Sequence, residues 1–222
     1  MTYDEILSSV TLMLKREEDA DLISVLPTFI RFIEAEINRG RRVVQMEVRS
    51  RTTLESGRWA YGWPNDFLGL RSISMIEPSG KQSNMEFLPP EQLIDLNETQ
   101  CTSASGSDVT WYYTIHNDMY QIAPIPAFTE PGYIEVVYYQ AIPPLNGLDK
   151  LGGLITENWL STQFPDIYYY GLCKHAQPFI FNDERIATMA AMYQTAVEGL
   201  YTNNDKQTWS GTTMRMRVRG SY

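Results

Sequence analysis

Cysteine and histidine are scarce in this chain of 222 residues, which has only two of each. Cys101 lies in a polar stretch rich in Thr and Ser, and Cys173 lies in an aromatic segment, so the sequence predicts neither a disulfide framework nor a cysteine-based metal site. His116 and His175 stand in no spacing that would hold zinc. We therefore expect no metal and no cofactor, and two free thiols suit a reducing cytoplasm.

Long apolar runs are absent as well. No stretch approaches the roughly 18 residues that a membrane span needs. The first ten residues, MTYDEILSSV, carry acidic residues where a secretory signal would carry Lys or Arg ahead of an apolar core. We expect a protein that does not contact a membrane and stays in the cytoplasm where it is made.

The sequence motifs of common enzymes are missing too. The chain has no GxSxG, no GxxxxGK[ST] and no GxGxxG, so it predicts no nucleophile elbow and no phosphate-binding loop. On a helix Cys173 and His175 would lie about 200° apart around the axis, which prevents the hydrogen-bonded pair that activates a nucleophile. The sequence therefore predicts that the protein is not an enzyme.

Carboxylates, in contrast, are plentiful. A pair such as Glu34 with Glu36, or Asp183 with Glu184, could in principle serve glycoside hydrolysis, which needs two carboxyl groups at a controlled separation. With 27 acidic residues such pairs arise by chance, and a solvated surface explains most of them. Glu34 differs, because its neighbours are apolar, and it could pair with an arginine.

Charge is distributed unevenly along the chain. The net charge is −9, but from Lys206 onward there are four basic residues and no acidic ones. Residues 1–205 therefore hold 14 basic against 27 acidic residues, a net charge of −13. An acidic body argues against a domain that binds duplex DNA, which needs a basic surface to displace counterions. A short basic tail favours docking onto an acidic or polar partner.

Helical periodicity is found at both ends of the chain. Ile6, Val10 and Leu14 recur at every fourth residue, and a second apolar series begins at Leu22 and continues to residue 37, so two amphipathic helices are predicted there. Asp19 to Asp21 supply an N-cap region for the second helix, and Pro27 either begins that helix proper or kinks it. The basic run that follows, Arg39, Arg41 and Arg42, complements the negative end of its dipole. Helical patterns return in residues 165–179, where Pro165 suits the first turn, and then from Asn182 or Asp183 as cap.

The middle of the chain has a period of two. From residue 43 to about residue 145, short β-rich runs alternate with Pro, Gly, Asn and Asp, which predicts an antiparallel β region with a hairpin turn at Asn117 and Asp118 and one short helix in PPEQLIDL. We therefore predict an α+β fold. In it the terminal helices (residues 1–42 and 154–205) close one α-helical bundle, a β-rich domain (43–153) is inserted, and an extended C-terminal tail (206–222) follows.

The tail holds the candidate binding residues. Residues 214–219 alternate apolar with basic side chains, which places the two kinds on opposite sides of a strand. A lone strand is unstable in water, so this segment is either disordered or adds to the edge of another chain's sheet. Trp209 nearby could anchor in a partner's pocket. The candidate docking residues are Trp209, Met214, Arg215, Met216, Arg217, Val218 and Arg219.

Five segments, taken in order, resemble the head-to-tail adaptor (connector) family of tailed bacteriophages, especially the short-tailed ones. They are LPTFIRFIEAEINRGRRVVQME, WPNDFLGLRSI, YQIAPIPA, IEVVYYQAIPPL and NWLSTQFPDIYYYGLCKHAQPFIFNDERI. Together they touch most of the chain from residue 26 to residue 201. The sequence departs from the family at HND, where a glycine-containing turn is expected, and in the stretch around Cys101.

The resemblance implies a structural virion protein of the phage neck, assembled in the host cytoplasm. Such a protein would form a ring of identical subunits, a dodecamer, beneath the portal protein. The helical bundle would form the ring wall, the β domain would face tail tube, nozzle or tail-fibre proteins, and the C-terminal tail would dock on the portal. Genomic DNA would pass through the acidic lumen without sequence-specific binding.

Two other functions stay open at this stage. Some phage connector proteins also degrade cell wall, which would need a cleft with two carboxylates. The Trp and Tyr content would suit a tail-associated carbohydrate-binding protein, and the cluster Tyr168, Tyr169 and Tyr170 could be taken for a stacking platform. On a helix these three rings point in different directions, so packing in a core or a subunit interface explains them better.

Overall fold

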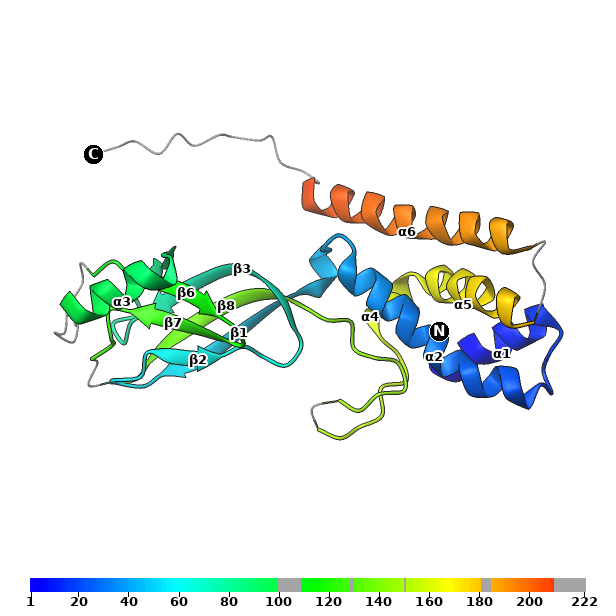
Figure 1. Ribbon diagram of the computed structural model, residues 1–222, viewed down its shortest axis with the longest axis horizontal. Helices are drawn as coiled ribbons and strands as arrows, with labels where there is room; N and C mark the ends of the chain where they lie inside the picture. Colours follow the sequence, from blue (N-terminus) through cyan, green and yellow to red (C-terminus); the bar gives the residue numbers. More distant parts are fainter. Residues whose placement is uncertain (100–108, 128–129, 150, 181–184, 210–222) are drawn as a thin grey trace. The chain divides into compact units, whose positions relative to one another are not determined.

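The computed structural model describes residues 1–99, 109–127, 130–149, 151–180 and 185–209. The chain divides into two compact units, one formed by Met1–Gln45 with Ile142–Tyr222 and the other by Met46–Ala141. The described residues contain six α-helices and two mainly antiparallel sheets, so the predicted α+β class is confirmed (Figure 1).

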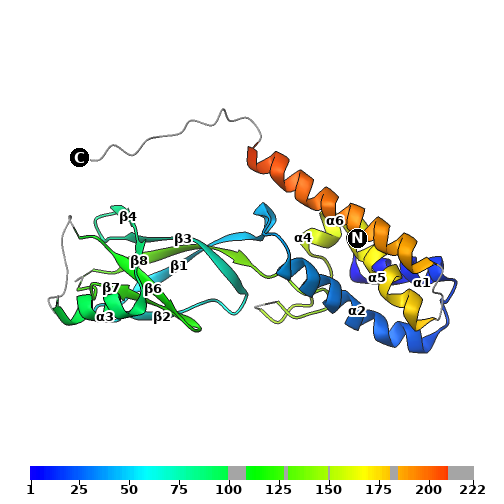
Figure 2. The same cartoon turned by 45° about the horizontal axis from the view of Figure 1, so that its top comes forward.

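The first unit is helical. Its helices are α1 (Tyr3–Leu14), α2 (Ala20–Arg39), α4 (Trp159–Gln163), α5 (Pro165–Phe179) and α6 (Ile186–Trp209). Helix α5 is the central one, because it packs against α1, α2, α4 and α6 (Figure 2). It begins with Pro165 in its first turn, where the missing N–H costs no hydrogen bond.

The two N-terminal helices follow the predicted pattern. Asp19 is the N-cap of α2 and accepts a hydrogen bond from the Leu22 N–H at 3.1 Å. The helix continues through Pro27, which neither begins it nor ends it. The apolar face of α2 is fully buried through Leu22, Leu26, Ile30, Ile33 and Ile37.

The second unit is a β-sandwich. One sheet has the order β1 (Glu47–Leu54), β8 (Gly132–Gln140), β3 (Phe67–Ile76) and β4 (Gln82–Asn84). The other has the order β2 (Ala60–Gly62), β7 (Met119–Ala123), β6 (Tyr112–His116) and β5 (Glu86–Phe87). The predicted short helix is α3 (Pro90–Thr99). The β6–β7 hairpin turns at Asn117, whose φ of 52° is left-handed, so the predicted turn is confirmed, while β5 pairs with β6 in parallel.

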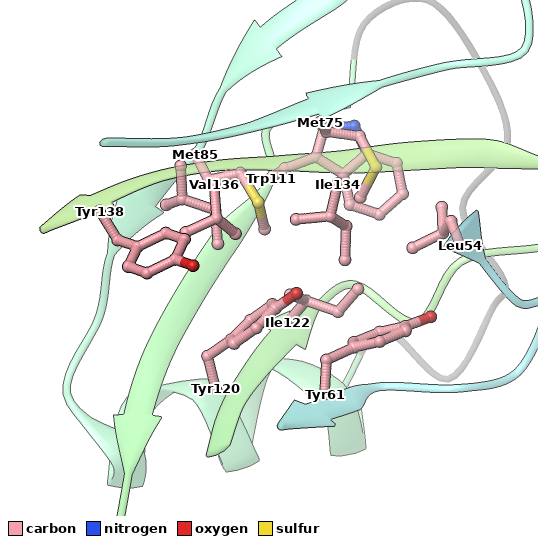
Figure 3. Close-up of a cluster of buried hydrophobic side chains, with 11 residues drawn as sticks. Leu54, Tyr61, Met75, Met85, Trp111, Tyr120, Ile122, Ile134, Val136 and Tyr138 are labelled. Carbon is pink, nitrogen blue, oxygen red and sulfur yellow. The ribbon is translucent and has the colours of Figure 1, made fainter. Parts of the chain in front are cut away.

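Large apolar side chains fill the space between the two sheets. Figure 3 shows Ile134, Val136 and Tyr138 of β8 facing Tyr120 and Ile122 of β7. The rings of Tyr61 and Tyr120 stack with their centroids 5.8 Å apart. Successive residues of a strand point to opposite faces of the sheet, so every second residue of β8, from Ile134 to Tyr138, enters the core.

Glu135 points to the other face of the first sheet and connects its strands. Its side chain is 5% exposed. Glu135 Oε2 accepts a hydrogen bond from Arg51 Nε of β1 at 2.8 Å, and Glu135 Oε1 accepts one from Gln82 Nε2 of β4 at 3.3 Å. Gln82 also donates to Ser74 Oγ of β3 at 2.9 Å. One carboxylate thus gathers polar groups from all four strands.

Two boundaries differ from the sequence analysis. Helix α6 continues to Trp209, so residues 206–209 are helical and not extended. Residues 142–153 group with the helical unit, because helix side chains accept hydrogen bonds from their backbone: Asn38 Oδ1 from the Ile142 N–H at 3.0 Å, and Glu34 Oε1 from the Leu145 N–H at 2.9 Å. The expected cap of the last helix, Asn182 or Asp183, lies outside the described residues.

Two helical glycines make a matched test of the packing around α5. A Cβ added at Gly171 would lie 2.7 Å from Ile33 Cδ1 and 3.1 Å from Tyr193 Cε2, both in buried side chains, whereas nothing lies within 4 Å of a Cβ added at Gly199. We expect Gly171→Ala to lower the free energy of unfolding by about 1–3 kcal/mol through overpacking. Gly199→Ala should raise it by about 0.5–1 kcal/mol. Urea unfolding followed by circular dichroism measures both, and equal effects would contradict the packing.

Candidate functional site

The candidate docking residues lie at and beyond the end of α6. Trp209 is the last residue of this helix, and Met214, Arg215, Met216, Arg217, Val218 and Arg219 lie outside the described residues. The described part of the candidate site is therefore the C-terminal end of α6 together with the residues that contact it. We call it the C-terminal junction, and it consists of Arg41, Val44, Gln45, Tyr201, Asn204, Asp205 and Gln207.

Hydrogen bonds hold the last turns of α6 to the chain that leaves α2. The Val44 N–H donates to Asn204 Oδ1 at 2.8 Å, and Gln45 Nε2 donates to Gln207 Oε1 at 2.9 Å. Because Asn204 is only 8% exposed, its bond is shielded from competing water. The end of α6 is thus fixed to residues that are 160 and 162 positions away along the chain.

Arg41 adds charge to the junction. Its Nη2 donates to Asp205 Oδ1 at 3.0 Å, its guanidinium lies 5.3 Å from the centre of the Tyr201 ring, and its backbone N–H donates to the Tyr201 hydroxyl at 3.2 Å. Both charged side chains are about half exposed or more, so the ion pair itself contributes little to stability. The ion pair instead helps to orient α6, because it joins one face of this helix to the chain that follows α2.

The sequence does not predict this junction. Its basic run after α2 is expected to cap the helix C-terminus, and two of these residues do so: Arg39 Nε donates to the Ala35 carbonyl at 3.1 Å and Arg42 donates to the Asn38 carbonyl. Arg41 instead pairs with Asp205. No local pattern could have linked these two residues, because 164 positions separate them.

A second group of polar side chains lies inside the helical unit, around Glu34. Glu34 Oε1 accepts hydrogen bonds from the Leu145 N–H at 2.9 Å and from the Tyr168 hydroxyl at 3.0 Å. Asn158 Nδ2 donates to the Tyr168 hydroxyl and to the Pro143 carbonyl, both at 2.9 Å. The expected arginine is not among these partners. We call this set the Glu34 network, and it joins α2, α5 and the segment between β8 and α4.

Burial governs the protonation of the Glu34 network. It raises the pKa of Glu34, although the hydrogen bonds from Leu145 and Tyr168 oppose the rise. Burial, with the nearby Glu34 carboxylate, also raises the pKa of the Tyr168 hydroxyl. Tyr168 therefore stays a neutral donor at all physiological pH values, and only Glu34 can change its charge.

The candidate catalytic groups sit in unreactive surroundings. Burial raises the pKa of the Cys173 thiol to about 11, so the nucleophilic thiolate is disfavoured. Burial and the neighbouring Lys174 lower the pKa of His175, whose ring stacks on Phe29 with centroids 5.7 Å apart. Within the described ranges no group of three or more His, Cys, Asp and Glu residues could hold a metal ion.

The members of the candidate carboxylate pairs and of the tyrosine cluster lie in different surroundings where they are described. Glu34 is buried in its network, while Glu36 pairs with Lys174 at 3.3 Å. Asp183 and Glu184 lie outside the described residues. Tyr168 is buried, and Tyr169 meets Tyr170 edge to face with ring centroids 5.5 Å apart.

Among the described helices, none has the length and the apolar composition that a membrane span requires.

An α+β chain whose polar side chains tie distant segments together, and in which burial disfavours the charged forms of Cys173 and His175, has features that suit a structural assembly protein. The model of the SU10 adaptor protein family matches residues 1–219, and the chain belongs to this family. It is a family of phage head-to-tail adaptors, which confirms the resemblance and makes the chain a structural component of a virion. A search of curated proteins found no match.

The Tyr168 hydroxyl bridges Glu34 and Asn158, so its removal tests the Glu34 network. We expect Tyr168→Phe to lower the free energy of unfolding by about 1–3 kcal/mol, because two buried polar groups lose a partner. Tyr170→Phe is the matched control on the same helix, and it should change stability by less than about 0.5 kcal/mol. Urea unfolding at neutral pH compares the two variants, and a similar loss in both would argue against the network.

The raised pKa of Glu34 predicts a pH dependence of stability. Because the folded state holds the Glu34 proton more tightly than the unfolded state does, Glu34 favours folding below its ordinary pKa of 4.5 and loses this contribution as the pH rises through the raised value. Glu34→Gln keeps the acceptor oxygen but cannot ionise. We expect the stability of the Gln variant relative to the wild type to increase between pH 4 and pH 8. Unfolding at a series of pH values measures this difference, and a difference independent of pH would refute it.

Proposed function

We propose that this protein forms a ring in the phage neck, between the portal protein and the tail, and docks on the portal through the segment that follows α6. The observation that carries the proposal is the family match, because it extends over residues 1–219 and so includes all seven candidate docking residues. The ring is proposed to be a dodecamer.

The C-terminal junction supports a docking role for the tail. A terminal segment delivers a binding motif best when the residue from which it starts is fixed, since fewer conformations are then lost on binding. Asn204 and Gln207 fix the root against residues 44 and 45. Residues 214–219 would add as a strand to a sheet edge of the portal, where backbone bonds give affinity and the arginines meet carboxylates.

The charge distribution supports the passage of DNA through the ring. Residues 1–205 carry a net charge of −13, which has the same sign as the phosphate backbone. A lumen of that sign does not hold DNA in place, so the genome can slide during ejection. Contact with DNA would then involve no sequence-specific binding.

The two units of the chain would have different roles in the ring. The helical unit, residues 1–45 with the chain from residue 142 to the end of α6, would form the ring wall, and the β unit, residues 46–141, would face tail tube, nozzle or tail-fibre proteins. The free protein would be a monomer, and the portal would template the ring. A purified protein that is already a ring in solution would contradict this step.

Removing residues 210–222 tests the docking, because it leaves all of α6 and the C-terminal junction in place. We expect the full chain to form rings on purified cognate portal and the truncated chain to bind at least about tenfold more weakly. Electron microscopy and sedimentation measure the two results. Equal binding of both chains would overturn the docking mechanism, and no binding of the full chain would overturn the proposed function.

A charge-reversal variant shows whether docking depends on the charge of the tail or only on its presence. Arg215→Glu, Arg217→Glu and Arg219→Glu together keep the tail but reverse its charge, while the three corresponding Arg→Lys changes serve as the control. We expect the Glu variant to lose portal binding and the Lys variant to retain most of it, with binding of the wild type weakening as salt is raised.

A further inference from the structure

An ordered loop in the helical unit presents three leucines to solvent. Leu148, Leu151 and Leu154 are 70%, 96% and 59% exposed. Single exposed leucines are common, but three in a stretch of seven residues make an apolar protrusion, which a soluble protein rarely displays without a partner. We call the described residues of this stretch, 146–149 and 151–155, the leucine loop.

Hydrogen bonds hold the leucine loop in shape. Its two arms are joined by the Asn146 N–H donating to the Ile155 carbonyl and the Ile155 N–H donating to the Gly147 carbonyl, both at 2.8 Å. At the tip, Asp149 Oδ1 accepts from the Leu151 N–H at 2.8 Å and from the Gly153 N–H at 2.7 Å. A loop that is already ordered loses little conformational entropy when it docks.

The same unit has an apolar groove between α5 and α6. Its volume is about 630 Å³, and its lining includes Phe164, Tyr170, Ala191, Met192 and Gly199. Met192 is 42% exposed, so part of this lining is open to solvent. At Gly199 an added Cβ would meet nothing within 4 Å, which leaves room for a side chain from outside.

The groove and the leucine loop lie on different sides of the helical unit. Figures 1 and 2 both draw α6, one wall of the groove, along one edge of this unit, and the loop on the opposite side beyond α2 and α4. A chain therefore cannot fill its own groove with its own loop. Two unlike surfaces on one subunit make a head-to-tail contact between copies, and such a contact generates a ring when the rotation closes.

We propose that the leucine loop of one copy docks in the α5–α6 groove of the next copy, and that this contact builds the ring. The inference rests on the proposed ring function and adds the surfaces that form it. Leu151, the most exposed of the three leucines, enters the groove over Gly199. The contact is apolar, so it should weaken little as salt is raised, unlike the docking of the basic tail.

Disulfide trapping on the portal tests the contact. Full-length chains with Leu151→Cys and with Gly199→Cys, both also carrying Cys101→Ser, are mixed on cognate portal rings and oxidised. We expect a disulfide between positions 151 and 199, identified from the mass of the linked peptides, while Cys173 is buried and stays unreacted. The matched control replaces Leu151→Cys with Leu12→Cys, since Leu12 is 62% exposed on α1 of the same unit.

Each outcome decides the inference or the proposed function. Subunits bound to the portal with no more 151–199 disulfide than the control overturn the inference alone, and so does linkage of Gly199→Cys to the portal protein. A 151–199 disulfide in chains that do not bind the portal supports the contact and overturns portal docking. The absence of both overturns both.

Blocking variants give a second readout. A Cβ at position 199 meets nothing within 4 Å, so Gly199→Phe should place its ring in the groove, and Leu151→Asp places a charge on the loop. Each should raise the concentration that gives half of the rings by at least about tenfold, while Leu12→Asp should not. An equal mixture of the two blocked variants retains one intact loop and one intact groove, so it should form pairs and no rings. Rings formed normally by either variant would overturn the inference.

Discussion

A carboxyl group buried between helices needs hydrogen-bond donors, and the helical unit depends on how Glu34 obtains them, both at Oε1. An unpaired buried charge would cost several kcal/mol. Glu34 accepts from the Leu145 N–H and from Tyr168, and Tyr168 is held in turn by Asn158. Its two donors come from positions 111 and 134 residues further along the chain. The Glu34 network is therefore complete only when α2, α5 and the segment that follows β8 are packed together.

The same device secures both ends of the inserted β unit. On the way out of the helical unit, the Val44 N–H donates to the Asn204 side chain, and on the way back the Ile142 N–H donates to the Asn38 side chain. Both acceptors are side-chain amides of helices. One donor begins a short 3₁₀ helix, Val44–Met46, and the other follows the end of β8, so each amide satisfies a backbone N–H at the end of a regular element. Helix residues thus bond to the chain where it leaves the helical unit and where it returns.

Local signals in the sequence predicted local structure well. The four-residue spacing gave α2 and its buried face, Asp19 gave its cap, Pro165 gave the start of α5, and Asn117 gave the hairpin. Contacts between distant residues could not be predicted in this way. The partners of Glu34 and the pairing of Arg41 with Asp205 depend on tertiary packing, and so does the extension of α6 to Trp209, since its last turns bond to residues 44 and 45. The leucine loop could not be recognised from the sequence, because leucines are usually buried and only the structure shows that these three are exposed.

The proposed contacts explain why a ring would form on the portal and not in solution. One loop in one groove buries too little apolar surface to offset the loss of translational and rotational freedom between two free subunits. A subunit whose basic tail is already docked has its neighbour within reach, so the second contact becomes effectively intramolecular. Each added subunit then gains one tail contact and one loop contact, and the last subunit gains a second loop contact as the ring closes. A weak contact between loop and groove, combined with stronger docking of the basic tail, would therefore favour assembly of the ring on the portal.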